Sequence, residues 1–182
     1  MTSRGPDIVL VGYRGAGKSA VGRALADQLG WPLVETDQLV RDKAGLSIAE
    51  IFTRYGEERF RQLEAAVIGD LEASAPAVVS AGGGAVLRPE NVARLRSIGT
   101  VVWLTASPEE LWRRISNDPA SRVSRPDLTA AGGLEEVRRV LEARTPLYRA
   151  ASDLQIDTAG RTSSQVAELI LSLIRGGPPG QR

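Results

Sequence analysis

The 182-residue sequence contains neither cysteine nor histidine. The lack of cysteine excludes disulfides and thiolate metal sites. The lack of histidine excludes a histidine-based catalytic triad. Any proton transfer during catalysis must therefore rely on a carboxylate, a lysine, a tyrosine or solvent.

The sequence also lacks an excess of either charge and any long apolar segment. Lysine and arginine number 23 against 22 aspartates and glutamates, so there is no global basic field for a nucleic acid. No stretch approaches the roughly 20 apolar residues that span a bilayer, and the start of the chain does not resemble a signal peptide. We therefore expect a cytoplasmic protein with no nucleic-acid partner and no membrane segment.

Length and composition fit one globular domain. Hydrophobic residues make up 42% of the chain and charged residues 25%, which is ordinary for a packed protein. Residues 1–175 are predicted to form the domain, and residues 176–182, rich in glycine and proline, are predicted to be a disordered tail. No internal repeat is visible, which argues against a solenoid.

Short apolar runs alternate with longer amphipathic segments, a pattern typical of a parallel sheet covered by helices. Ser47 with Glu50 and Ser107 with Glu110 fit capping boxes that open helices, and Thr162 marks a third opening. The predicted strands are residues 8–11, 32–35, 77–80, 100–104 and 154–157.

Residues 117–133 interrupt this alternation with two prolines, two glycines and little apolar periodicity. Long loops in compact domains are usually functional lids or disordered. Arg114, Arg122 and Arg125 lie within or close to the segment, and they favour a lid over a bound nucleotide.

Residues 12–19 read Gly-Tyr-Arg-Gly-Ala-Gly-Lys-Ser and fit the phosphate-binding pattern G-x4-G-K-[ST]. Its glycines let successive backbone N–H groups point at a phosphate, and the following helix adds its positive end. Lys18 is predicted to reach the β- and γ-phosphates, and the Ser19 hydroxyl to bind Mg²⁺. The residues predicted to hold the triphosphate are Arg14, Gly15, Ala16, Gly17, Lys18 and Ser19.

Phosphate binding alone does not name a reaction. The sequence has no Asn-Lys-x-Asp guanine motif, and the switch and coupling elements of GTPases and motors are not found. A small-molecule kinase is therefore the leading class.

Polar residues after the second predicted strand belong to the acceptor side of the predicted site. Asp37 follows residues 32–35, and ligands bind at the carboxyl ends of such strands. Asp37 also suits the N-cap of a following helix. Arg61 and Glu64 are three residues apart and share a helical face, either as a site pair or as a solvated surface pair.

Two further features suit an acceptor site. Gly82, Gly83 and Gly84 follow the third predicted strand, where bare backbone lets a substrate approach closely; a flexible turn is the alternative. Arg144 ends a long helical segment before Pro146, which is predicted to stop the helix. Arg144 also suits a cation that stabilises a helix C-terminus.

Together these motifs resemble the shikimate kinase family, from Ile8 to about Ile174. The family pattern runs in order through the P-loop, Asp-x-Asp, Gly-x-x-x-Phe-Arg-x-x-Glu, Gly-Gly-Gly, Arg-Pro and Arg-x-Pro-x-Tyr. The matching segments here are residues 12–19, 35–37, 56–64, 82–84, 125–126 and 144–148.

The resemblance implies an α/β fold of the P-loop NTPase type, with three αβα layers, a five-stranded parallel sheet and a lid loop. It implies a monomer that uses ATP as co-substrate and Mg²⁺ as cofactor to phosphorylate the 3-hydroxyl of shikimate. Lys18, Asp37 and Arg125 are the implied catalytic residues.

By the same resemblance, Arg125 and Arg161 join the P-loop in binding ATP, although a surface charge is the alternative for Arg161. Glu64 would orient Arg61. Phe52 and Phe60 suit either the apolar face of the substrate or the core. The implied substrate-binding residues are Asp37, Arg61, Gly82, Gly83 and Arg144, and the implied metal site is Ser19 with Glu35.

The sequence departs from the family at Glu35, where aspartate is common, so the role of this residue in the outer coordination shell of the metal stays an open question. Arg114 and Arg122 compete for the contact with adenine in the early lid. The rival interpretations are another small-molecule kinase, such as a gluconate kinase-like protein, and a catalytically silent nucleotide-binding regulator.

Overall fold

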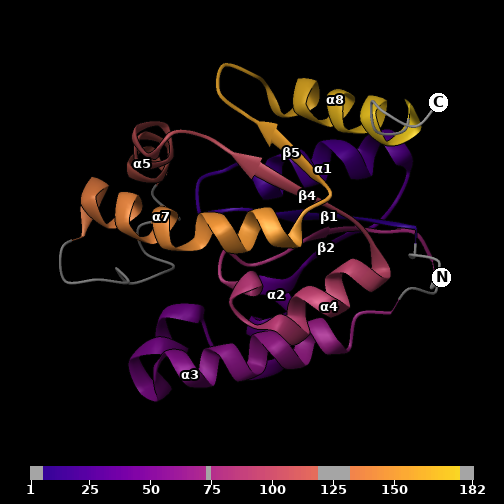
Figure 1. Cartoon of the computed structure of the whole chain (residues 1–182). Helices are drawn as coiled ribbons and strands as arrows, with labels where there is room; N and C mark the ends of the chain where they lie inside the picture. The colour runs from indigo at the N-terminus through magenta and orange to yellow at the C-terminus, as the bar shows by residue number, and fades with distance from the viewer. Residues whose placement is uncertain (1–5, 73–74, 119–131, 177–182) are drawn as a thin grey trace.

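The computed structural model describes residues 6–72, 75–118 and 132–176 (Figure 1). Five parallel strands form one sheet in the order β2-β3-β1-β4-β5. All five predicted strands are present, each within one residue of its predicted bounds. The strands are β1 (Asp7–Val11), β2 (Leu33–Glu35), β3 (Val78–Ser80), β4 (Gly99–Thr105) and β5 (Leu154–Asp157).

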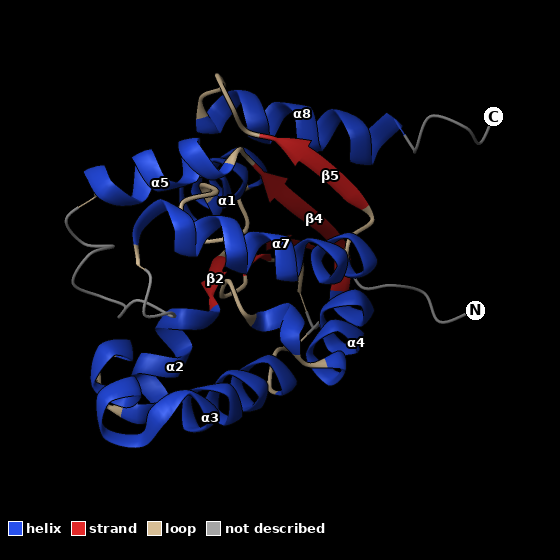
Figure 2. Cartoon of the chain, turned by 60° about the vertical axis from the view of Figure 1, so that its left-hand side comes forward, coloured by secondary structure: helices blue, strands red, loops and turns tan. Residues whose placement is uncertain are grey.

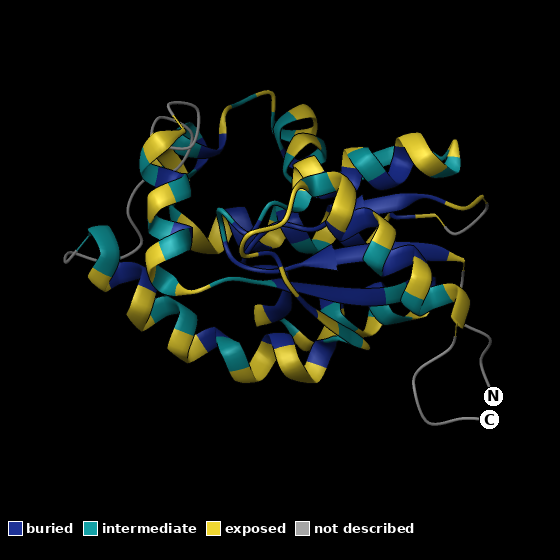
Figure 3. Ribbon diagram, turned by 90° about the horizontal axis from the view of Figure 1, so that it is seen from above, coloured by how far each residue is buried: buried dark blue, intermediate teal, exposed yellow. Residues whose placement is uncertain are grey.

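The strands are apolar because both faces of the sheet are covered. Alternate side chains of a strand point to opposite faces, so Val9 and Val11 enter one core cluster while Ile8 and Leu10 enter the other. Figure 3 shows the buried strands lying between helices whose outer sides are exposed. This confirms the predicted three-layer α/β arrangement.

The helices divide between the two faces (Figure 2). On one face, α1 (Lys18–Leu29) and α8 (Ser163–Gly176) pack together, and α5 (Pro108–Asn117) contributes to the same core. On the other face lie α2 (Thr36–Ala44), α3 (Ile48–Gly69) and α4 (Pro89–Ile98). The long helix α7 (Gly133–Ala151) contributes residues to both core clusters.

Two of the predicted helix openings have the expected capping geometry. The Ser47 Oγ accepts a hydrogen bond from the Glu50 N–H, and the Glu50 carboxylate accepts one from the Ser47 N–H. Thr162 and Gln165 make the same reciprocal pair at the start of α8. These bonds satisfy backbone donors that the first turn leaves without helical partners.

The capping box predicted at Ser107 is only half present. The Ser107 Oγ accepts from the Glu110 N–H, at 3.2 Å. The Glu110 carboxylate instead binds Arg113 and Arg114 on its own helix. The prediction of a reciprocal box was wrong because two guanidinium groups lie one turn away and bind the carboxylate more strongly than a backbone N–H does.

The predicted stop at Pro146 was also wrong, because α7 continues through this proline to Ala151. A proline in a helix interior loses one backbone hydrogen bond and strains the preceding turn. Tyr148 and Ala151 lie beyond it and are buried in the core, and their packing offsets that cost. Arg144 therefore lies well inside α7, which excludes its role as a charge at a helix end.

No helix within the described ranges combines the length and apolar character needed to cross a bilayer.

Candidate active site

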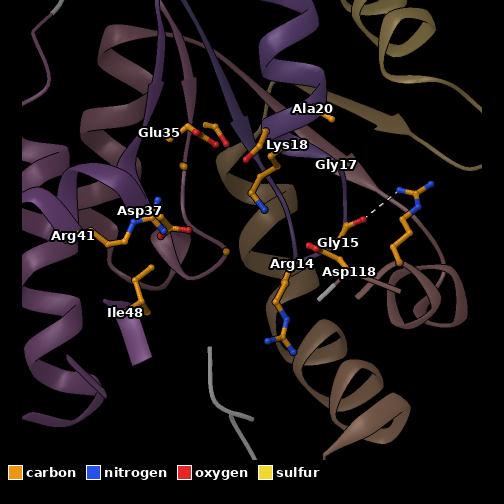
Figure 4. A pocket seen from close by; sticks show the side chains of 15 residues that line it. Arg14, Gly15, Gly17, Lys18, Ala20, Glu35, Asp37, Arg41, Ile48 and Asp118 are labelled. Carbon is orange, nitrogen blue, oxygen red and sulfur yellow. Dashed lines mark hydrogen bonds between the residues drawn. The ribbon is translucent and has the colours of Figure 1, made fainter. Parts of the chain in front are cut away.

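The site forms where the carboxyl ends of β1, β2 and β3 meet. Leu10, Ser80 and Glu35 are paired across these strands, so the segments that follow them emerge side by side. A cavity of about 480 Å³ opens there (Figure 4). Among its lining residues are Arg14, Gly15, Gly17, Lys18, Ser19, Glu35, Asp37 and Gly83.

The loop after β1 has the geometry of a phosphate cradle. Gly12 has φ 145°, and a β-carbon there would lie 2.5 Å from the Leu104 carbonyl oxygen, so only glycine fits. Gly17 has φ 91° and immediately precedes α1, whose N-terminus attracts anions. The ammonium group of Lys18 donates to the carbonyl oxygens of Gly12 and Tyr13, at 2.8 and 3.0 Å.

Asp37 lies in the first turn of α2 and is not its N-cap. The helix begins at Thr36, so Glu35 takes the cap position. The capping interpretation of Asp37 was therefore wrong. Figure 4 shows the Asp37 carboxylate facing the space into which Lys18 reaches, and both residues line the cavity.

The glycine triplet approaches Asp37 directly. The N–H of Gly82 donates to the Thr36 hydroxyl at 2.9 Å. A β-carbon at Gly82 would lie 2.7 Å from Oδ1 of Asp37 and 2.6 Å from Oε1 of Glu64. Carboxylates from α2 and α3 thus meet at one backbone position, and a larger residue there would push them apart.

Arg61 is buried, so the interpretation of Arg61 and Glu64 as a solvated surface pair was wrong. Nη1 of Arg61 donates to Oε2 of Glu64 at 2.8 Å, and Nη2 donates to Oε1 of Glu57 at 2.9 Å. Burial by itself lowers the pKa of the Arg61 guanidinium. The charges and hydrogen bonds of Glu64 and Glu57 outweigh that effect and hold the pKa above its usual value.

The backbone at Gly56 aims this part of α3 at the triplet. Gly56 has φ 79° and ψ 174°, which breaks the helical path and redirects the following turns. A β-carbon at Gly84 would overlap the Arg61 guanidinium. Phe60 is buried in the core, and its ring lies 4.9 Å from that of Phe52.

Arg144 reaches the same triplet from α7. Its Nη1 donates to the carbonyl oxygen of Gly83 at 3.2 Å, and the residue is 9% exposed. Arg61 and Arg144 are 83 positions apart in the sequence, yet their guanidinium groups contact adjacent glycines. Two guanidinium groups beside bare backbone and Asp37 form a place for a small anion that carries hydroxyl groups.

A second cavity adjoins the P-loop at Ala16 and Gly17 and includes Arg114 and Arg161. Arg114 donates to the Thr158 hydroxyl at 2.9 Å and to Oε1 of Glu110 at 2.7 Å. Arg161 is exposed and donates to the Asp157 carbonyl at 3.1 Å. Arg114 also donates to the Gly15 carbonyl at 3.3 Å, which fixes it beside the loop.

Other sequence predictions fall outside the described residues. Arg122 and Arg125 lie there, as does most of the predicted lid at 117–133. The terminal helix α8 ends at Gly176, one residue beyond the predicted domain boundary.

Ser19 and Glu35 line the same cavity as Lys18. Within the described ranges, no group of three or more acidic side chains is placed to hold a metal ion. Mg²⁺ in nucleotide enzymes is usually bound by one or two protein oxygens with phosphates and waters. A hydroxyl and a carboxylate beside the phosphate cradle fit that kind of site.

A family model described as shikimate kinase matches residues 14–175. The chain belongs to the shikimate kinase family. A shikimate kinase of Symbiobacterium thermophilum is 44% identical over 175 residues, covering 96% of this chain and 99% of that protein. The acceptor motifs and the P-loop from Arg14 onward lie within the residues that the family model matches.

Solved structures of this family have the same fold. Shikimate kinase from Acinetobacter baumannii in complex with shikimate has a TM-score of 0.88 and 34% identity, over 94% of this chain and 93% of that one. A gluconokinase from Sinorhizobium meliloti has a TM-score of 0.57 and 22% identity, over 95% and 94%. The second likeness is one of fold alone.

Proposed function

We propose that this member of the shikimate kinase family transfers the γ-phosphoryl group of ATP to the 3-hydroxyl of shikimate, giving ADP and shikimate 3-phosphate. One observation carries the assignment of the acceptor. The guanidinium groups of Arg61 and Arg144 meet at Gly83 and Gly84, close to Asp37 and beside the P-loop. This arrangement suits a small ring acid with several hydroxyl groups.

On the nucleotide side, the backbone N–H groups of residues 14–19 and the N-terminus of α1 bind the phosphates. The Lys18 ammonium exchanges its two carbonyl partners for oxygens of the β- and γ-phosphates. Arg161 and Arg114 line the second cavity beside the loop, where the adenosine part would lie. Arg125 is proposed to add positive charge to the transferring group.

On the acceptor side, Arg61 and Arg144 hold the shikimate carboxylate, because a guanidinium group binds a planar carboxylate through two parallel hydrogen bonds. Glu64 keeps the Arg61 guanidinium in place. Gly82 and Gly83 present bare backbone to the ring.

Asp37 orients the attacking hydroxyl. The oxygen of this shikimate hydroxyl attacks the γ-phosphorus while the bond from phosphorus to the bridging oxygen of ADP breaks. The hydroxyl proton passes to the Asp37 carboxylate. Phosphoryl transfer depends mainly on such alignment and on neutralising the developing charge. With no histidine in the chain, Asp37 is the best-placed base.

Ser19 and Glu35 would hold Mg²⁺, with Ser19 supplying a direct oxygen and Glu35 acting through a metal-bound water, because Mg²⁺ usually keeps several of its waters. When bound there, Mg²⁺ would neutralise negative charge on the phosphates. We further propose that the enzyme acts as a cytoplasmic monomer on the small molecules ATP and shikimate, without nucleic-acid or membrane partners. The near-balance of charge supports the absence of a nucleic-acid partner.

Steady-state kinetics test the proposal directly. ADP release is measured with shikimate, with gluconate and with no acceptor, at saturating MgATP. We expect rapid turnover with shikimate alone. Preference for gluconate would assign the chain to another small-molecule kinase class, and no turnover with either acid would support a silent nucleotide-binding regulator.

A further inference from the structure

Tyr148 is a buried tyrosine that the proposed reaction does not use. It lies on α7 one turn beyond Arg144, and none of its surface is exposed. Its hydroxyl donates a hydrogen bond to the carbonyl oxygen of Gly83. Nη1 of Arg144 donates to the same oxygen. Two side chains of one helix therefore donate hydrogen bonds to a single carbonyl oxygen of the acceptor site.

The Tyr148 ring is itself fixed. It stacks on Trp103 of β4, with ring centroids 5.7 Å apart and planes inclined by 20°. Burial raises the pKa of Tyr148 to about 12, so the hydroxyl keeps its proton under all ordinary conditions. The Gly83 carbonyl thus accepts from a hydroxyl that stays protonated and whose ring is held against β4 of the central sheet.

Neighbouring positions are anchored by different groups. The N–H of Gly82 donates to the Thr36 hydroxyl. Beyond the triplet, the buried side-chain amide of Asn91 donates to the carbonyl oxygen of Ala85 at 3.1 Å. Between these anchors, the contacts of Tyr148 and Arg144 with Gly83 orient the peptide that links Gly83 to Gly84.

This peptide sets the spacing of the two acceptor arginines. Arg144 contacts its Gly83 end, and the Arg61 guanidinium lies against Gly84 with no room for a β-carbon between them. A rotation of the peptide would therefore move the backbone into Arg61 or remove the partner of Arg144. A carboxylate held by both arginines is sensitive to small changes in their separation.

We infer that Tyr148 is a positioning residue for the acceptor: its hydroxyl fixes the Gly83 carbonyl and thereby the relative placement of Arg61 and Arg144. The inference rests on the proposed function, in which these arginines hold the shikimate carboxylate. Tyr148 does not touch the substrate or the nucleotide in this scheme. Its loss should weaken acceptor binding and leave nucleotide binding intact.

Tyr148→Phe tests this, because it removes the hydroxyl and keeps the ring that stacks on Trp103. We expect KM for shikimate to rise roughly tenfold, the size of effect of one lost hydrogen bond. KM for ATP should stay within about twofold, since Lys18 keeps its contacts with the carbonyl oxygens of Gly12 and Tyr13. Calorimetric titration with shikimate should show the same loss of affinity.

A matched control variant separates the positioning effect from a general loss of stability. Ile170→Val removes one methylene from a fully buried side chain of α8, in the core on the other face of the sheet. It should lower Tm with both KM values unchanged. An unchanged shikimate KM in Tyr148→Phe, or equal increases in both KM values, would overturn the inference.

A double-mutant cycle adds an independent measurement. If Tyr148 acts through the placement of Arg144, the shikimate KM of the Tyr148→Phe/Arg144→Lys double variant should rise by less than the product of the single effects. Multiplicative effects would overturn the coupling. The wild-type enzyme serves as the reference, and its failure to use shikimate would refute the proposed function. Normal wild-type turnover together with an unchanged shikimate KM in Tyr148→Phe would refute only the positioning role.

Discussion

Glu64 holds the guanidinium of Arg61 from one turn further along α3, with Oε2 2.8 Å from Nη1. The two residues are 1% and 7% exposed, so their charges are largely removed from water. Glu57 contacts Arg61 as well, but its side chain is 54% exposed. The two carboxylates bind one guanidinium in different dielectric surroundings and should differ in their effect on stability.

We expect Glu64→Ala to lower the free energy of unfolding by about 3 kcal/mol, because it leaves a buried cation short of its main partner. Glu57→Ala should cost less than about 1 kcal/mol, since exposed pairs are screened by solvent. Urea denaturation of both variants measures the difference. Equal losses would show that the Arg61–Glu64 pair is no more desolvated than the outer one.

Arg144→Ala should raise the KM for shikimate far more than the KM for ATP. Removing one partner of a desolvated charge pair typically costs about 2–5 kcal/mol, which corresponds to a fall in kcat/KM of roughly 30-fold to several thousand-fold. Steady-state kinetics with each substrate varied in turn provides the measurement. An unchanged shikimate KM would remove Arg144 from the acceptor site.

Asp37→Asn should lower kcat severely while ATP still binds, because the amide keeps the shape of the carboxylate but is a poor proton acceptor. General-base assistance is worth about 10²–10⁴-fold in rate. Single-turnover kinetics and a nucleotide titration separate the chemical step from binding. Near-normal turnover would leave Asp37 only its place in the first turn of α2.

Substitution of Glu35 should affect the requirement for Mg²⁺ and leave the binding of the acceptor unchanged. Glu35→Asp should retain substantial activity, because contacts through a metal-bound water tolerate small changes in reach. Glu35→Ala should raise the Mg²⁺ concentration needed for half-maximal activity and leave the shikimate KM nearly unchanged. Activity is measured against Mg²⁺ at saturating ATP and shikimate. Superimposable curves for wild type and Glu35→Ala would exclude a metal role.

Glu110 should make stability depend on pH in the acid range. Hydrogen bonds from Arg113 and Arg114 lower the pKa of the Glu110 carboxyl to about 2, against an ordinary 4.5. A folded-state pKa below the unfolded one stabilises the protein above the unfolded pKa, and this contribution disappears as pH falls through the folded pKa. Tm should therefore be lower in Glu110→Gln than in wild type at pH 6, and the gap should narrow between about pH 4.5 and pH 2. A gap that is constant with pH would contradict the ion pairing.

The sequence by itself determined the nucleotide-binding part of the site and most of the fold, because both depend on interactions between residues that are close together in the chain. The P-loop is a contiguous run whose glycines and lysine act on their own backbone, and α1 begins within it, at Lys18. The strands were predictable because burial on both faces demands short apolar runs. The capping pairs at Ser47 and Thr162 form within one turn, so no distant contact decides them.

Only the tertiary structure decided which polar residues are buried and which helices continue. The pair of Arg61 and Glu64 looks the same in sequence whether solvated or buried, and the packing of Gly84 against Arg61 makes it buried. Likewise, Pro146 predicts a helix end by local rules, yet the burial of Tyr148 beyond it keeps α7 intact. The contact of Tyr148 and Arg144 with Gly83 joins residues more than 60 positions apart. Such contacts depend on chain folding over long sequence distances, which no local pattern encodes.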